Sequence, residues 1–162
     1  MVSLARAIEH LSAVETDLSE ELRLLADDSE AESELGQECL SLSLQADGRA
    51  SALRSWSERY PPEPDREGPV AQSPWRSVRA EIPRLGPGTL DRGLANLGDL
   101  RRLFLMAQEC AMGWLMLHRA AQAARERQLL DLVTAGRAAM AKTIGWLEGR
   151  IEETSPRVVL GA

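Results

Sequence analysis

Leucines at seven-residue intervals near the start of the chain constrain the fold more than any other feature. Residues spaced by seven, with others three or four positions between them, share one face of an α-helix. Here the spaced positions are Leu4, Ile8, Leu11, Leu18, Leu22 and Leu25. The remaining slot in the row is Glu15. The pattern predicts a long amphipathic helix over residues 4–27 with one carboxylate set into its apolar face.

Three further helical stretches follow, each with its own end signals. The second is expected over residues 30–60, with Ser29 as its N-cap, Glu32 completing a capping box, and a proline run beginning at Pro61 to end it. The third is expected over 97–125 and the fourth over about 129–155, where Pro156 should stop it. The charged residues 125–127 are the expected turn between them.

Residues 61–97 are rich in proline and glycine and form a long connection in the middle of the chain. Connections of this length inside one domain are uncommon. Short helical turns are expected within it at 75–82 and 89–97. Its apolar residues are expected to pack it onto the helices; they are Trp75, Val78, Ile82 and Leu85. The segment is therefore interpreted as a crossover strap and not as a linker between domains.

Two helices, a long strap and two more helices predict one domain over residues 1–162. The fold class is all-α, an antiparallel four-helix bundle. A strap of more than about thirty residues can cross the length of a helix, so the third helix can lie parallel to the second. This is the bundle topology with one long crossover connection.

The last two helices carry the residues of a resemblance. They read AMGWLMLHRAAQAARERQLLDLV over 111–133 and TIGWLEGRIEETSPRVV over 143–159. With the topology of the whole chain, these stretches resemble small bacterial members of the ferritin-like superfamily. The resemblance implies a ferritin-like bundle and, in the superfamily at large, a di-metal centre held by two glutamates and two Glu-x-x-His pairs.

The ligands of that centre are largely missing from this chain. It contains no Glu-x-x-His sequence, and the inward row of the last helix has no ionisable side chain: Val133, Gly136, Met140, Thr143 and Ile144. Glu15 and Glu109 alone cannot enclose two metal ions. We therefore expect no di-metal centre, no cofactor and no catalytic residues, and iron oxidation or storage is not expected.

Two polar positions on the core faces remain as candidates. Glu15 is either a retained metal or ligand contact or a buried carboxylate paired with Arg49 on the second helix; burying an unpaired charge is costly, so a partner is expected. His118 falls on the core face of the third helix and is interpreted as a hydrogen-bonded core residue. With His10 and Glu15 it could instead form a small metal site.

The third helix has a second apolar row on another side, formed by Leu105, Met112 and Met116, with Glu109 among them. A helix that is apolar on two sides is central or lies at a contact. The row predicts a homodimer or a contact with another protein. The competing interpretation is that the strap covers it, with Trp75 and Ile82 against this face. Glu109 is interpreted as a surface residue beside the contact, or as a vestige of a metal ligand.

Charge and cysteine content narrow the function classes. The net charge is −6 with no basic stripe, which argues against nucleic acid. No stretch resembles a signal peptide or a membrane span, so a cytoplasmic protein is expected. Cys39 and Cys110 are expected to be buried free thiols.

The favoured function is a non-catalytic ferritin-like bundle that acts through protein association, as a scaffold or accessory subunit. The alternatives are a degenerate metal or small-ligand binder built on Glu15, His118 and His10, and an oxidase whose ligands lie elsewhere in the chain.

Overall fold

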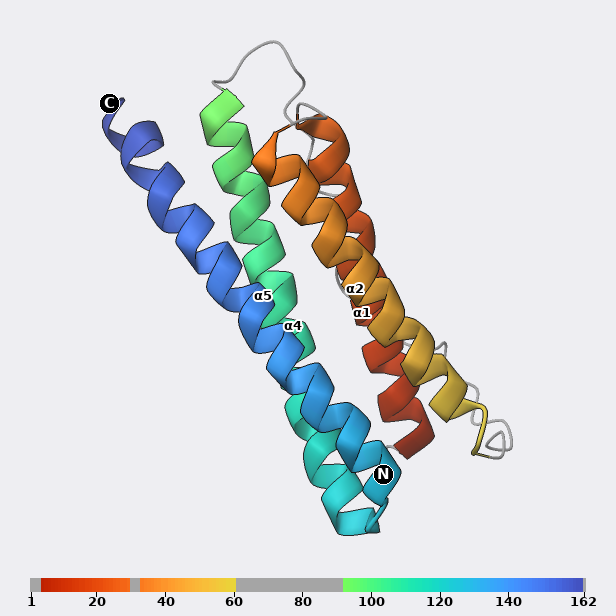
Figure 1. The fold of residues 1–162 in the computed structure, drawn as a ribbon. Helices are drawn as coiled ribbons and strands as arrows, with labels where there is room; N and C mark the ends of the chain where they lie inside the picture. The colour runs from red at the N-terminus through yellow and green to blue at the C-terminus, as the bar shows by residue number, and fades with distance from the viewer. Residues whose placement is uncertain (1–3, 30–32, 61–91, 162) are drawn as a thin grey trace.

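The computed structural model describes residues 4–29, 33–60 and 92–161, and all regular structure in these ranges is helical. Four helices result: α1 (Leu4–Asp28), α2 (Glu34–Ser57), α4 (Arg92–Ala124) and α5 (Arg127–Leu160). Figure 1 shows them side by side as one elongated bundle. The all-α class and the four helices are therefore confirmed. In the described residues, none of the helices combines the length and the apolarity that a membrane crossing needs.

The helices pack in a ring, in the order α1, α2, α5, α4. α1 packs along α2 and α4, α4 packs along α5, and α2 meets α5 only lightly. Contacts fix the register of the neighbours. Between α1 and α2, Ser12 meets Ala50 and Ser19 meets Ser43. Between α1 and α4, Glu15 meets Trp114, and the later Glu21 meets the earlier Arg102.

Small side chains bring α1 and α2 close together. The Ser12 hydroxyl donates a hydrogen bond to the Ala50 carbonyl at 3.0 Å, and the Ser19 hydroxyl donates to the Ser43 carbonyl at 3.0 Å. All four residues are buried. Buried hydroxyls are tolerated only when they are bonded in this way, because losing water without a partner is costly. Leucine spacing alone did not reveal this serine and alanine seam.

Large apolar side chains hold α4 to its neighbours, and two glycines make room for them. A Cβ at Gly136 would lie 2.5 Å from the Trp114 ring, and a Cβ at Gly113 would lie 2.7 Å from Leu11. Trp114 is the largest fully buried side chain. The most buried residues of α4 also include Leu103, Met106, Cys110 and Leu117.

Four predicted helix ends differ from the structure. Ser33, not Ser29, caps α2: its side chain accepts a hydrogen bond from the Gly36 backbone N–H at 3.1 Å, while the Ser29 hydroxyl donates to the Leu25 carbonyl at the end of α1. Glu32 lies outside the described residues. α2 ends at Ser57, and residues 58–60 form a turn with hydrogen bonds between residues three apart.

α4 begins at Arg92 instead of near residue 97. Gly98 lies within the helix on an exposed side, where glycine costs helix stability but does not break it. The last part of the predicted strap is therefore helical. Residues 61–91, including Trp75, Val78, Ile82 and Leu85, lie outside the described residues.

Pro156 does not stop the last helix, contrary to the prediction; α5 continues to Leu160. Proline removes the hydrogen bond that the carbonyl four residues earlier would accept. That carbonyl belongs to Glu152, an exposed residue that water can reach. Just before the proline, the Thr154 and Ser155 hydroxyls donate to the carbonyls of Arg150 and Ile151 at 2.7 and 2.6 Å.

The turn between α4 and α5 is where the charged residues predicted it. Arg125 has φ +58°, and the Arg125 and Glu126 backbone N–H groups donate to the carbonyls of Gln122 and Ala121. This is the Schellman pattern of helix ends, in which glycine usually takes the left-handed position. Because an arginine takes it here, the sequence shows no glycine at the turn.

Candidate functional site

Glu15 lies at the centre of the bundle and is fully buried. Arg49 of α2 binds it with two parallel hydrogen bonds: Nε donates to Oε1 at 2.9 Å and Nη2 donates to Oε2 at 3.0 Å. A guanidinium and a carboxylate match each other in this geometry, which makes the pair stronger than a single contact. The predicted pairing of Glu15 with Arg49 is confirmed.

Trp114 is a second partner of Glu15, which sequence reasoning missed. Its indole Nε1 donates a hydrogen bond to Glu15 Oε1 at 2.6 Å, across 99 positions of sequence. The far edge of the same ring lies over Gly136 of α5. One buried carboxylate thus connects α1, α2 and α4, and the indole that binds it fills the space toward α5. The available signal was the smallness of Gly136 on an otherwise apolar row.

The other polar candidates do not converge on Glu15. His118 is half-buried at the edge between α4 and α5, where its Nδ1 lies 3.4 Å from Arg137 Nη1. It is therefore not the fully buried core residue that the stripe predicted. His10 and Glu109 are half-buried on α1 and α4. Among the described residues, no group of three or more His, Cys, Asp or Glu side chains could hold a metal ion.

The two cysteines are free and buried, as predicted. Burial, with a contribution from the neighbouring Glu38 charge, raises the pKa of Cys39 to about 12. Burial, with the nearby Glu15 charge, also raises the pKa of Cys110 well above its usual value. Both thiols stay protonated at neutral pH, and the thiolate is the reactive form of cysteine. Neither residue is suited to nucleophilic chemistry.

A polar cluster joins α2 to α5, the two neighbouring helices that pack together least. Glu38 accepts hydrogen bonds from Trp146 Nε1 at 2.8 Å and from Arg150 Nη2 at 2.6 Å. Burial acts to raise the pKa of Glu38, but the hydrogen bonds from Arg150 and Trp146 outweigh it and leave that pKa below its usual value. Sequence analysis did not identify this cluster. It is a connection between helices, with every named group already paired.

The face of α4 that points away from the bundle carries Leu105, Met112 and Met116, called the outer row below. Their side chains are 44%, 55% and 63% exposed, respectively. Leu94 and Leu115 on the same helix are also exposed. The sequence located these residues on a second side of the helix, and none of the described helices covers that side.

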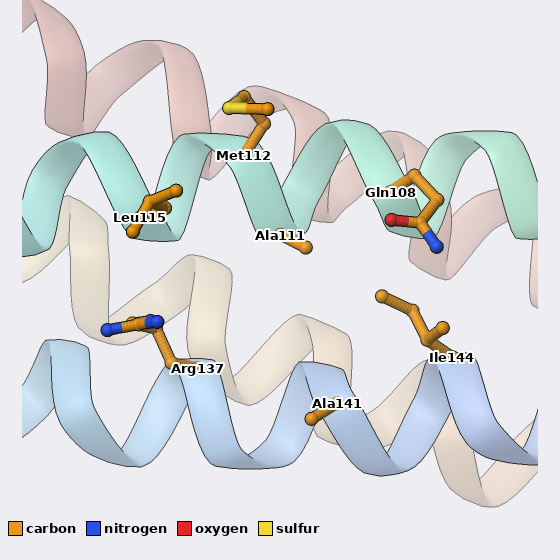
Figure 2. Close-up of a pocket in the computed structure, with 7 residues that line it drawn as sticks. All are labelled: Gln108, Ala111, Met112, Leu115, Arg137, Ala141 and Ile144. Carbon is orange, nitrogen blue, oxygen red and sulfur yellow. The ribbon is translucent and has the colours of Figure 1, made fainter.

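A groove of about 330 Å³ runs between α4 and α5 beside the outer row. Figure 2 shows its lining: Gln108, Ala111, Met112, Leu115, Arg137, Ala141 and Ile144. The two alanines face each other across the middle, and longer side chains stand at either end. The lining is mostly apolar, so the groove extends the apolar surface of the outer row toward α5. Met112 belongs to both.

Comparison with protein-family models, with curated proteins and with solved structures finds no match for this chain.

Proposed function

We propose that this protein is a non-catalytic bundle that acts through protein association, as a scaffold or accessory subunit, with the outer row as its contact. One observation carries the proposal: three large apolar side chains stand 44–63% exposed on one face of one helix. Scattered exposed apolar residues are ordinary, but a contiguous apolar patch on a globular protein often marks a contact. Methionine adapts its shape to a partner, which suits such a surface.

We infer further that the bundle has the ferritin-like topology with one long crossover. The register supports this inference. Along α1, later residues meet earlier residues of both α2 and α4, so α2 and α4 run in the same direction. Parallel second and third helices require a connection that crosses the bundle length, and residues 58–91 are long enough for it. The two buried free thiols fit a reducing compartment, and we place the protein in the cytoplasm.

The competing proposal, a small-ligand or metal binder at Glu15 and His118, loses its main support. It required an unpaired Glu15 facing a polar cavity. Both carboxylate oxygens are instead engaged by Arg49 and Trp114, and His118 contacts Arg137. The core around them is filled by leucine, alanine and methionine side chains. An arginine cation at this level also opposes a metal cation electrostatically.

The association has two forms, a homodimer or a complex with a different protein. Both place the outer row in an interface and remove its apolar surface from water, which contributes roughly 25 cal/mol per Å² buried. The alternative that the strap covers this row, through Trp75 and Ile82, concerns residues outside the described ranges.

The test combines light scattering on the purified chain with affinity purification from the native cell. The double variant Met112→Ser/Met116→Ser removes apolar surface without touching the core. Leu44→Ser is the matched control, because Leu44 on α2 is 60% exposed, close to the 63% of Met116. A dimer, or a captured protein, that survives Leu44→Ser but is lost in the double variant is the expected result.

A monomeric wild-type chain that captures no protein would overturn the proposal. So would an association that the double variant leaves intact, because the contact would then lie elsewhere on the surface.

A further inference from the structure

The groove between α4 and α5 has the shape of a socket for one large apolar side chain. Ala111 and Ala141 face each other across its middle, Leu115 and Arg137 stand at one end, and Gln108 and Ile144 stand at the other (Figure 2). Two small side chains bounded by four longer ones resemble the hole that receives one side chain of a neighbouring helix in knobs-into-holes packing. Such sockets fit a helix lying along the seam between two others.

Arg137 lines this socket, and Arg119 lies one helical turn beyond its lining residue Leu115; among the described residues, neither guanidinium has an acidic partner. Arg137 contacts His118 Nδ1 at 3.4 Å, and Arg119 donates a hydrogen bond to Gln122 Oε1 at 3.2 Å. Within the described part of the chain, no carboxylate lies within ion-pair distance of either. Elsewhere on the same two helices, Arg102 binds Glu21 and Asp99, and Arg150 binds Glu38.

This local positive charge contrasts with the chain as a whole, which has 25 acidic and 19 basic residues. Arg119 follows Leu115 by four positions and Met112 by seven, so it lies on the same side of α4 as these two groove residues. Arg137 reaches the socket from α5. The apolar surface is therefore bordered by cations at the end nearest the α4–α5 turn.

We propose that the partner presents an amphipathic helix whose apolar face is flanked by aspartate or glutamate. This inference rests on the proposed association function and names the partner's chemistry. One large apolar side chain of that helix enters the socket over Ala111 and Ala141, and its neighbours cover the outer row. Its carboxylates bind Arg119 and Arg137, and guanidinium–carboxylate pairing fixes the register.

The dimensions suit a helix of moderate length. Residues 105–119 of α4 span about 21 Å at about 1.5 Å per residue. A partner helix of roughly four turns covers that length and presents three or four apolar residues to the outer row and the socket.

The experiment measures binding of synthetic peptides to the full chain by fluorescence anisotropy. One labelled peptide of about 18 residues has a leucine face flanked by glutamates, long enough to form helix on binding. A second replaces every glutamate with lysine, and a third replaces the leucines with serine. The proteins are wild type, Arg119→Glu/Arg137→Glu, a remote charge-reversal control, Arg157→Glu at the exposed end of α5, and Met112→Ser/Met116→Ser.

The expected result is that wild type binds the glutamate peptide about tenfold more tightly than the lysine peptide, as two exposed attractions are exchanged for repulsions. Arg119→Glu/Arg137→Glu should reverse the preference and Arg157→Glu should keep it. The serine peptide should not bind. Circular dichroism of each variant checks that the helices are intact, which exposed substitutions should leave unchanged.

The remaining outcomes separate this inference from the proposed function. If wild type binds the glutamate and lysine peptides equally and Met112→Ser/Met116→Ser binds neither, the outer row is still the contact, but the inference that the partner is acidic is overturned. No peptide binding by a chain that forms a dimer through the outer row means that a second copy occupies it, and the inference is overturned while association stands. No peptide binding by a monomer that captures nothing overturns both.

Discussion

The bundle carries one charged carboxylate inside its apolar core and a row of large apolar side chains on the outer face of α4. Inside, the Glu15 carboxylate is fully buried but has Arg49 and Trp114 as partners. Outside, the outer row is about half exposed and stands in water. Polar groups are normally exposed and large apolar groups buried, so both regions depart from expectation.

The two regions differ in whether other residues of the same chain supply the contacts that each region needs. The central carboxylate of α1 has its hydrogen-bond partners on α2 and α4, so it serves folding and leaves nothing for a ligand. The outer row lacks a covering surface in the described residues. A buried charge whose partners lie in the same chain stabilises the fold. An uncovered row of apolar side chains points instead to contact with a partner.

Removing Arg49 should have the largest effect on stability. Arg49→Met leaves the Glu15 carboxylate buried with only the Trp114 N–H, and breaking a buried ion pair in this way costs about 3–5 kcal/mol. Urea unfolding at neutral pH measures the loss. Adding Glu15→Gln to Arg49→Met removes the second charge and keeps an oxygen for Trp114, so the double variant should recover much of the stability.

This cycle also tests the closed character of the centre. If Arg49→Met costs less than about 1 kcal/mol, Glu15 is reached by solvent in solution, because exposed ion pairs contribute no more than that. The contrast between a fully paired buried carboxylate and an uncovered outer row would then not hold.

A methyl group at Gly136 should have the next largest effect. In Gly136→Ala the new Cβ would lie 2.5 Å from Trp114, and that ring cannot retreat without stretching its bond to Glu15. Overpacking of this kind costs about 1–3 kcal/mol, against a gain of about 1 kcal/mol in helix propensity. Thermal or urea unfolding should show a net loss.

Gly48 supplies the matched control for that substitution. It is an exposed helical glycine with nothing within 4 Å of an added Cβ. Gly48→Ala should therefore stabilise the chain by about 1 kcal/mol. Stabilisation by both alanines would show that Trp114 is not held where the ion pair places it.

Sequence patterns predicted the helices well because they depend on local spacing. Leucine periodicity located α1 to within one residue, and the charged residues at 125–127 marked the α4–α5 turn. Ends that depend on tertiary surroundings were harder. Pro156 sits where water can replace its missing hydrogen bond, so it does not end α5 as the sequence suggested, and α4 begins at Arg92, before the expected start near residue 97.

The candidate site divides in the same way. Glu15 stood out from its apolar row, and Arg49 followed because a buried charge needs a partner. Trp114 as the second donor was missed, since contacts across 99 positions leave no local pattern. The groove was missed because Ala141 and Arg137 belong to α5, and their alignment with α4 depends on how the two helices pack.

Changing the outer row should have the smallest effect on the folded chain. Met112→Ser/Met116→Ser replaces side chains that are already 55% and 63% exposed, so the free energy of unfolding should change by less than about 0.5 kcal/mol. Urea unfolding, at a protein concentration where the wild type is monomeric, isolates this term from association. A loss above about 1 kcal/mol would mean that the row packs against another part of the same chain. The exterior would then be as complete as the centre, and the argument for a partner would lose its basis.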